Sequence, residues 1–279
     1  EAEGVGAPRP VALSRSVLVV GGGPAGLQAA IAAARNGHRV TLCERHELTG
    51  GSVRLAASVP NRAEFGDLVR NQFHEATRLG VEIETGVTLD AAEVLRRRPH
   101  SVVVATGARP ARPYWAPGDE HRIVDVIEVL DGAAAPSGRV VVLDELGFHQ
   151  ATSVAELLAD RGCDVEVITP GMVVGQDLGI TLDLETWWMR AESKGIVQTT
   201  ELVPMGWDQG TLTLQHHPTG TMHERTPDWV VLAVPATPAE ELYLELLDAG
   251  VDVHRAGDVV APRRAHAAVV DGERVGAAL

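Results

Sequence analysis

The stretch that decides the fold is residues 16–44, SVLVVGGGPAGLQAAIAAARNGHRVTLCE. It begins with a β-branched apolar run and passes through the pattern Gly21-x-Gly23-x-x-Gly26. A periodic apolar segment follows, and then a second apolar run that ends at Glu44. This order predicts a strand, a glycine turn, a helix and a second strand parallel to the first.

In this context the three glycines predict a binding site for the diphosphate of a dinucleotide. Gly21 permits the tight turn, Gly23 lets the backbone approach a diphosphate, and Gly26 allows close packing of helix on strand. The start of the helix directs unpaired N–H groups and a partial positive charge at the phosphates. Glu44 stands where a carboxylate is expected to accept the ribose hydroxyls of an adenosine. The carboxylate of Glu44 would repel a nucleotide that carries a 2′-phosphate. The positive charge of the neighbouring Arg45 weakens this repulsion.

The composition excludes several classes of protein. With 279 residues, 45% of them hydrophobic, the chain is long and apolar enough for one or two folded domains. A net charge of −14 argues against nucleic acid as a partner. No apolar run approaches the ~20 residues that span a bilayer, so we expect no membrane partner. The N-terminus does not resemble a signal peptide, and two Cys fit a reducing compartment, so we expect a cytoplasmic location. The missing initial Met leads us to expect a processed subunit or a piece of something longer.

The chain repeats its opening pattern further on. RVVVLDE (139–145), ATSVAELLADRG (151–162) and DVEVITP (164–170) predict a second strand–helix–strand unit about 120 residues downstream. The proline-rich segment ARPARPYWAPG (108–118) indicates a connector, with a boundary near residue 113. The fold class we predict is α/β, with two Rossmann-like dinucleotide-binding domains.

Four motifs together resemble a known group of flavoproteins. They are GGGPAGLQAA (21–30), CERHELTGG (43–51), VVVATGARP (102–110) and AGDVVAP (256–262). The chain resembles the C-terminal half of the trimethylamine dehydrogenase, histamine dehydrogenase and 2,4-dienoyl-CoA reductase group of two-dinucleotide-fold flavoproteins. The resemblance covers roughly residues 15–279. It implies a tether at 1–14, a discontinuous FAD- or ADP-binding domain at 15–112 plus 235–279, and an inserted NAD(P)-type domain at 113–234.

The resemblance also implies which residues contact the nucleotide. The diphosphate would be held by Gly21, Gly23, Pro24, Ala25 and Gly26, the adenosine by Glu44 and Arg45, and the length of the dinucleotide by Gly51, Ser52 and Val53. Val87 would meet the adenine through its backbone, Ala105, Thr106 and Gly107 would close over the nucleotide, and Gly257 and Asp258 would reach its ribityl or phosphate region. Where Ser52 stands, the family often has Gln.

The second unit departs from the pattern that a pyridine nucleotide needs. Asp144 and Glu145 stand where glycines are expected, and only Gly147 is a glycine. Carboxylates at this position repel a diphosphate, and their side chains block the approach of the backbone. We therefore predict that this unit does not bind NAD(P) in the usual way.

This loss of the second fingerprint resembles the amine dehydrogenase branch of the group. There a preceding barrel carries FMN and a four-iron cluster, and electrons leave to an electron-transferring flavoprotein. By this resemblance the barrel, FMN and cluster would lie on a missing portion or a partner subunit. The first nucleotide site can hold ADP in place of FAD in that branch, and the sequence leaves this choice open.

The function we predict is the nucleotide-binding portion of a flavin-dependent oxidoreductase, an amine or N-methyl dehydrogenase or demethylase. Two alternatives stay open: an NAD(P)H-dependent enoate or dienoyl reductase of the same group, and a non-catalytic subunit pinned by ADP. No residue stands out as a catalytic acid or base, so we expect no catalytic residue in this chain. We expect no metal site either, because His216 and His217 point to opposite faces of a strand and the two cysteines are far apart.

Overall fold

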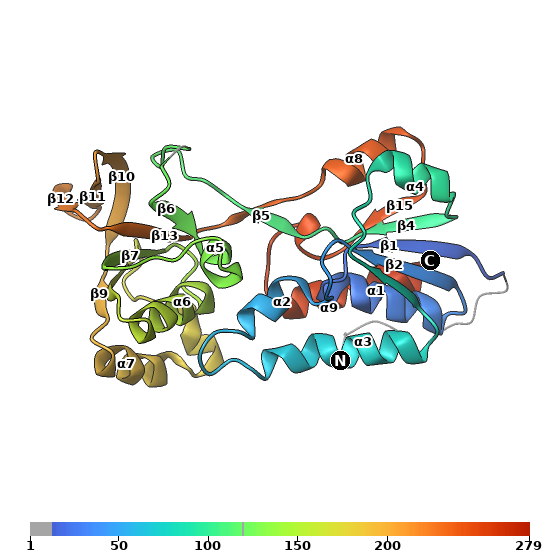
Figure 1. Ribbon diagram of the computed structural model, residues 1–279, viewed down its shortest axis with the longest axis horizontal. Helices are drawn as coiled ribbons and strands as arrows, with labels where there is room; N and C mark the ends of the chain where they lie inside the picture. Colours follow the sequence, from blue (N-terminus) through green and yellow to red (C-terminus); the bar gives the residue numbers. More distant parts are fainter. Residues whose placement is uncertain (1–12, 119) are drawn as a thin grey trace. The chain divides into compact units, whose positions relative to one another are not determined.

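The computed structural model describes residues 13–118 and 120–279, which form two compact α/β units (Figure 1). Of the predicted tether, residues 1–12 lie outside the described residues. Of the described residues, the first unit comprises 13–57, Arg62–Arg109 and Ala236–Leu279, and the second comprises Ser58–Asn61, 110–118 and 120–235. Among the described residues, no helix has the length and apolar character needed to cross a membrane.

The first unit is built on a five-stranded parallel sheet in the order β15-β4-β1-β2-β3. Its strands are β1 (Ser16–Val20), β2 (Arg39–Glu44), β3 (Glu82–Thr85), β4 (Ser101–Val104) and β15 (Val253–Arg255). The chain adds strands on one side of β1 and then returns to the other, so the order reverses between β1 and β4. Such a reversal opens a crevice at the carboxyl ends of the strands, where ligands bind in folds of this kind.

Helices cover both faces of this sheet. They are α1 (Pro24–Arg35), α2 (Gly51–Ala56), α3 (Phe65–Arg78), α4 (Ala91–Arg97), α8 (Glu241–Asp248), α9 (Ala265–Ala278) and the 3₁₀ turn η2 (Gly257–Val259). Side chains of α1, α3 and α9 form one core cluster with alternate residues of β1, such as Val17 and Val19. Leu18 and Val20 face the other way, into a cluster with α4 and α8. The period-two alternation of a buried parallel strand therefore produces two cores.

Helix α9 packs on α1 at the level of the backbone. A Cβ atom on Gly272 would lie 2.2 Å from the carbonyl oxygen of Ala25, and one on Gly276 would lie 2.3 Å from that of Ala29. Only glycine leaves room for this approach. The last segment of the chain is therefore held against the helix that follows the glycine turn.

The second unit contains another five-stranded parallel sheet, in the order β6-β13-β7-β8-β9. Its strands are β6 (Ile123–Asp125), β7 (Arg139–Asp144), β8 (Asp164–Ile168), β9 (Val197–Thr199) and β13 (Trp229–Ala233). One face packs on α5 (Val126–Asp131), α6 (His149–Asp160), α7 (Leu184–Ser193) and the 3₁₀ helix η1 (Gln176–Thr181). The two parallel sheets confirm the predicted α/β class with Rossmann-like folds.

The other face of this sheet carries a feature that the sequence pattern did not predict. Strands β10 (Leu202–Asp208), β11 (Thr211–His216) and β12 (Thr221–Arg225) form a separate antiparallel sheet. Strand β12 is exposed along most of its length and lacks an apolar alternation, so no sequence pattern marks it. Two short strands, β5 (Ala108–Pro110) and β14 (Ala236–Pro238), pair where the chain passes between the units.

Candidate functional site

The glycine turn after β1 is closed tightly at two of its three fingerprint positions. Gly21 has φ +110°, and a Cβ there would lie 2.3 Å from the carbonyl oxygen of Ala105. A Cβ on Gly26 would lie 1.9 Å from the carbonyl oxygen of Gly21. Both distances are far below ordinary contact, so these two glycines are required by packing within the protein itself.

The third fingerprint position, Gly23, is open. A Cβ there would meet no atom within 4 Å, although its backbone is extended, with φ −75° and ψ −179°. Gly23 is the N-cap of α1, which begins at Pro24 and has no side-chain cap and no acidic residue in its first turn. The first amides of α1 therefore lack the side-chain acceptor that usually satisfies them, beside a space that the protein leaves unfilled. This combination fits an anionic group such as a diphosphate.

Glu44, at the end of β2, is buried beside the turn with 5% of its surface exposed. Its Oε2 accepts the N–H of Gly22 at 2.7 Å, and its Oε1 accepts the N–H of His46 at 2.9 Å. A carboxylate has about four acceptor positions, so two amide bonds leave capacity for hydroxyl donors. Arg45 is exposed, and its Nε lies 3.1 Å from Nε2 of His46.

The loop before α2 reaches the same turn. The N–H of Gly50 donates to the carbonyl of Gly22 at 2.8 Å, and a Cβ on Gly51 would lie 3.2 Å from Cα of Gly23. Ser52 is exposed, whereas the side chain of Val53 is buried in the core cluster that includes α1. Only the backbone of Val53 can therefore face a ligand.

Two further segments border the turn and Glu44. The N–H of Ala105 donates to the carbonyl of Val20 at 2.8 Å, directly before Gly21. The hydroxyl of Thr106 is engaged within the protein, because its Oγ1 donates to the carbonyl of Ala239 at 2.8 Å. Val87 lies beside Glu44, because its N–H donates to the carbonyl of Glu44 at 2.9 Å. A backbone contact with adenine at Val87 is therefore better assigned to its carbonyl than to its N–H.

The segment Gly257–Asp258, from the C-terminal part of the chain, lies against the first turn of α1. Gly257 has φ +78°, and a Cβ there would lie 2.6 Å from Cβ of Ala25 in the first turn of α1. Burial raises the pKa of Asp258, while the N–H of Arg263 donates to its Oδ1 at 3.1 Å. The side chain of Arg263 forms an ion pair with Asp271 on α9. The sequence reasoning missed Asp271, because no motif marks it among the residues of α9.

The structure therefore brings together, within one unit, the segments that carry the predicted site residues. Gly107 follows Thr106 in the same unit, and its carbonyl accepts the N–H of Ala239 at 3.0 Å. The resulting site is made largely of backbone groups, with one buried carboxylate, Glu44, beside them. Such a site can bind and orient a nucleotide, and it offers no acid–base pair of its own.

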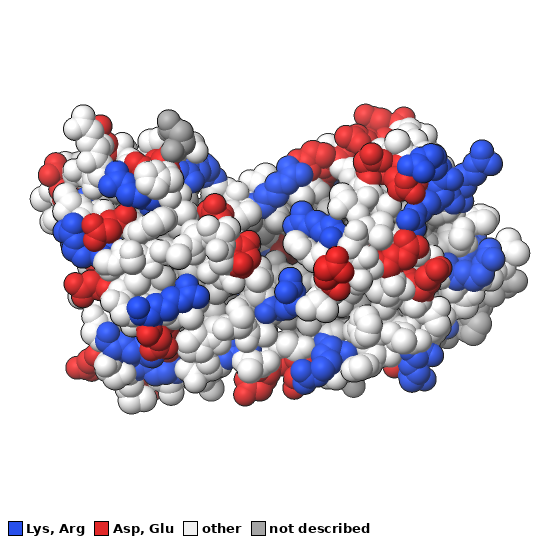
Figure 2. Space-filling model, in the orientation of Figure 1, with Lys and Arg blue, Asp and Glu red and all other residues white. Residues whose placement is uncertain are grey.

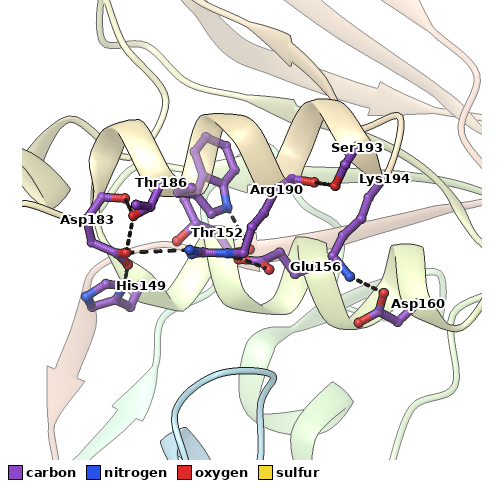
Figure 3. A network of polar contacts seen from close by, with 10 residues as sticks. His149, Thr152, Glu156, Asp160, Asp183, Thr186, Arg190, Ser193 and Lys194 are labelled. Atoms are coloured by element: carbon purple, nitrogen blue, oxygen red, sulfur yellow. Dashed lines mark hydrogen bonds and ion pairs between the residues drawn. The ribbon is translucent and has the colours of Figure 1, made fainter.

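The polar side chains of α6 and α7 form a structural network (Figure 3). Arg190 donates to the buried carboxylate of Glu156 at 3.0 Å and lies 3.6 Å from Asp183. Nδ1 of His149 is 4.0 Å from the same Asp183. Lys194 pairs with Asp160. These contacts tie two helices of the second unit together.

Other groups that could carry chemistry are not arranged for it. Burial and the nearby Glu84 raise the pKa of the Cys43 thiol to about 11, so it is protonated at neutral pH. Over residues 13–118 and 120–279, no three His, Cys, Asp or Glu side chains are grouped to hold a metal ion. On the face drawn in Figure 2, acidic and basic side chains are interspersed, with acidic ones gathered over α8.

Comparisons with known proteins agree with this geometry. The family model described as pyridine nucleotide-disulphide oxidoreductase matches residues 15–261. N,N-dimethylglycine/sarcosine dehydrogenase of Chromohalobacter salexigens is 32% identical over 98% of this chain and 46% of its own length. A probable N-methylproline demethylase of Rhizobium meliloti is 30% identical over 94% of this chain and 43% of its own length.

A solved structure shows the same fold. The 6-hydroxypseudooxynicotine amine oxidase of Pseudomonas geniculata superposes with a TM-score of 0.91 at 26% identity, over 98% of this chain and 43% of that one. The predicted resemblance to the C-terminal half of the trimethylamine dehydrogenase, histamine dehydrogenase and 2,4-dienoyl-CoA reductase group is thereby confirmed. The chain spans less than half the length of these relatives. By the match over most of its length, together with the glycine turn and the two parallel sheets, the chain belongs to the pyridine nucleotide-disulphide oxidoreductase family of flavoproteins.

Proposed function

We propose that the first unit binds FAD or ADP by its diphosphate at the turn between β1 and α1. One observation carries this proposal: Gly23 faces open space, whereas Gly21 and Gly26 are closed by atoms of the protein. Packing within the protein therefore accounts for glycine at positions 21 and 26 but not at position 23, where the turn leaves the backbone accessible. The uncapped first turn of α1 adds N–H donors and about half a positive charge.

The remaining contacts follow from the placement of each segment. Glu44 accepts the ribose hydroxyls of the adenosine, and the carbonyl of Val87 accepts from the adenine amino group. The backbone at Gly51 lies along the diphosphate, close to Gly23. Asp258, at the start of η2, faces the ribityl or phosphate region. Arg45, exposed and beside His46, borders the adenosine from the solvent side.

The longer protein, in this proposal, oxidises an amine or an N-methyl compound. The names of the relatives support it, because they include a dimethylglycine/sarcosine dehydrogenase and a probable N-methylproline demethylase. The substrate would bind outside this chain, on a barrel portion or subunit carrying FMN and an iron–sulfur cluster, with an electron-transferring flavoprotein as acceptor. A flavin, when bound, supplies the redox chemistry. The residues of this chain bind and orient the nucleotide.

Two measurements test the proposal and separate FAD from ADP. Denaturing the purified protein and determining the mass of the released nucleotide identifies it directly. Absorbance at about 450 nm before denaturation is expected for FAD and not for ADP. Release of a nucleotide other than these two, or of none from protein purified without chelators or denaturants, would overturn the assignment.

A charge-bearing variant tests the location of the site. Gly23→Asp places a carboxylate in the open space, where it blocks the backbone and repels a diphosphate. We expect the variant to fold and to retain no nucleotide. Gly179→Asp is the matched control, because Gly179 is exposed in the second unit and a Cβ there would also meet nothing within 4 Å. The control should retain the nucleotide fully.

A further inference from the structure

The amides that the first turn of α1 offers a ligand belong to two peptide groups. Pro24 has no N–H, and the N–H of Leu27 donates to the carbonyl of Gly23 at 2.9 Å. The donors at the start of the helix are therefore the N–H groups of Ala25 and Gly26. Each of them shares a rigid, planar peptide group with the carbonyl of the preceding residue, so the position of that carbonyl fixes the direction of the N–H.

Both of these carbonyls face other helices of the first unit. Nε2 of Gln72, on α3, donates to the carbonyl of Pro24 at 3.1 Å. The carbonyl of Ala25 faces α9, where a Cβ on Gly272 would lie 2.2 Å from its oxygen. The two peptide groups that would donate to a diphosphate are therefore held from the side opposite their N–H groups, one by a hydrogen bond and the other by close packing.

Gln72 is buried, with 6% of its surface exposed, and its amide is only partly satisfied. Its Nε2 also donates to Oε1 of Gln28 at 2.9 Å, and Nε2 of Gln28 donates to Glu273 on α9 at 2.6 Å. Its Oε1 is buried and has no hydrogen-bond partner among the described residues. An unpaired buried acceptor destabilises a fold, and a methionine of similar length would avoid that cost. The hydrogen bonds of Nε2 are therefore the contribution that an apolar side chain could not replace.

We propose that Gln72 is a positioning residue for the diphosphate, which fixes and polarises the peptide group between Pro24 and Ala25. A hydrogen bond to a carbonyl draws electron density away from the N–H of the same peptide group and makes that N–H a stronger donor. The bond also holds the amide in its binding direction before a ligand arrives, which reduces the ordering cost of binding. The inference rests on the proposed function, because it assigns Gln72 to the turn at which that function places the diphosphate.

The first test compares the binding of ADP by wild type, Gln72→Met and Gln28→Met in calorimetric titrations of nucleotide-free protein. ADP is the probe because it is also the adenine end of FAD. Gln72→Met removes the bond to Pro24 together with the unpaired oxygen, so Tm should stay within about 5 °C of the wild-type value. Its Kd for ADP should rise about 3- to 10-fold. Gln28→Met, the matched control, breaks the link to Glu273 and leaves the bond to Pro24, so its Kd should change less than about 2-fold.

The second test uses Gln72→Glu and does not depend on the methionine variant. A carboxylate cannot donate to the carbonyl of Pro24, whereas a protonated carboxyl group can. Burial raises the pKa of a carboxyl group at this position, so the ratio of the variant's Kd for ADP to that of wild type should fall at least about 3-fold between about pH 8 and about pH 5.5. Dividing by the wild-type Kd removes the titration of ADP itself, of Glu44 and of Glu273. The same ratio for Gln72→Met should not depend on pH.

Three results would overturn the inference and leave the proposed function intact. They are wild-type affinity for ADP in Gln72→Met, an equal loss of affinity in Gln28→Met, which would assign the effect to helix packing, and a ratio for Gln72→Glu that does not change with pH. If wild type binds no ADP, or if Gly23→Asp binds it as tightly as wild type, the proposed function itself fails. Gln72 then has no diphosphate to position.

Discussion

The variant Gly23→Ala tests whether glycine is required at this position by a bound diphosphate or by packing within the protein. Its φ and ψ suit any residue, and the new Cβ would meet nothing within 4 Å. The nucleotide-free protein should therefore keep its stability to within about 0.5 kcal/mol. With a diphosphate present, the methyl group takes the space that the backbone approach requires. Losing two amide bonds to a charged ligand, each contributing about 1.5–3 kcal/mol, weakens binding by about 3–6 kcal/mol, or roughly 10²- to 10⁴-fold.

Gly26→Ala is the contrasting variant. Its Cβ would lie 1.9 Å from the carbonyl oxygen of Gly21, where ordinary contact begins at 3.4 Å. An overlap of this size forces the helix away from the strand, and overpacking typically costs about 1–3 kcal/mol or more. We expect this variant to lose stability whether or not nucleotide is present.

The assay measures two quantities for each variant: nucleotide released per polypeptide, and urea unfolding of nucleotide-free protein. Gly23→Ala should lose nucleotide and keep its unfolding midpoint, whereas Gly26→Ala should shift the midpoint. Gly179→Ala serves as the control for both, because its Cβ is also unobstructed. If Gly23→Ala folds normally and retains nucleotide with unchanged affinity, the diphosphate does not lie at this turn and the reasoning fails.

Three further predictions concern stability. Gly276→Ala should destabilise the protein by at least about 1–3 kcal/mol in urea unfolding, because its Cβ would lie 2.3 Å from a carbonyl oxygen of α1; a gain, as expected from helix propensity alone, would show that α9 does not rest on α1. Arg190→Ala should cost about 3–5 kcal/mol by leaving the buried Glu156 unpaired, and a loss below about 1 kcal/mol would contradict the role of this pair. Arg122 lowers the pKa of Glu120 from 4.5 to about 2, so the carboxylate stabilises the fold fully above pH 4.5 and loses this effect as pH falls toward 2. The difference in stability between wild type and Glu120→Gln should shrink across that window, and a difference independent of pH would refute it.

Prediction from sequence succeeded where the pattern is local. The strand ending at Val20 and the helix after the glycine turn were recognised from the spacing of apolar residues and glycines over about twenty positions. The strand Arg139–Asp144 and helix His149–Asp160 of the second unit followed from the same kind of pattern. The antiparallel sheet went unrecognised, because an exposed strand such as β12 carries no alternation that a pattern search can detect.

The sequence by itself determined the glycine turn and the carboxylate at its side, because both depend on residue types at fixed spacings within one strand–helix–strand unit. The tertiary structure decided which glycine packing leaves open: a Cβ would meet no atom within 4 Å at Gly23, which holds at neither of the other two fingerprint glycines. It also decided that the carboxylate of Asp144 accepts the N–H of Gly175, 31 positions away. These outcomes depend on which backbone groups, distant in sequence, the fold brings into contact. The spacing of residue types along the chain does not specify those contacts.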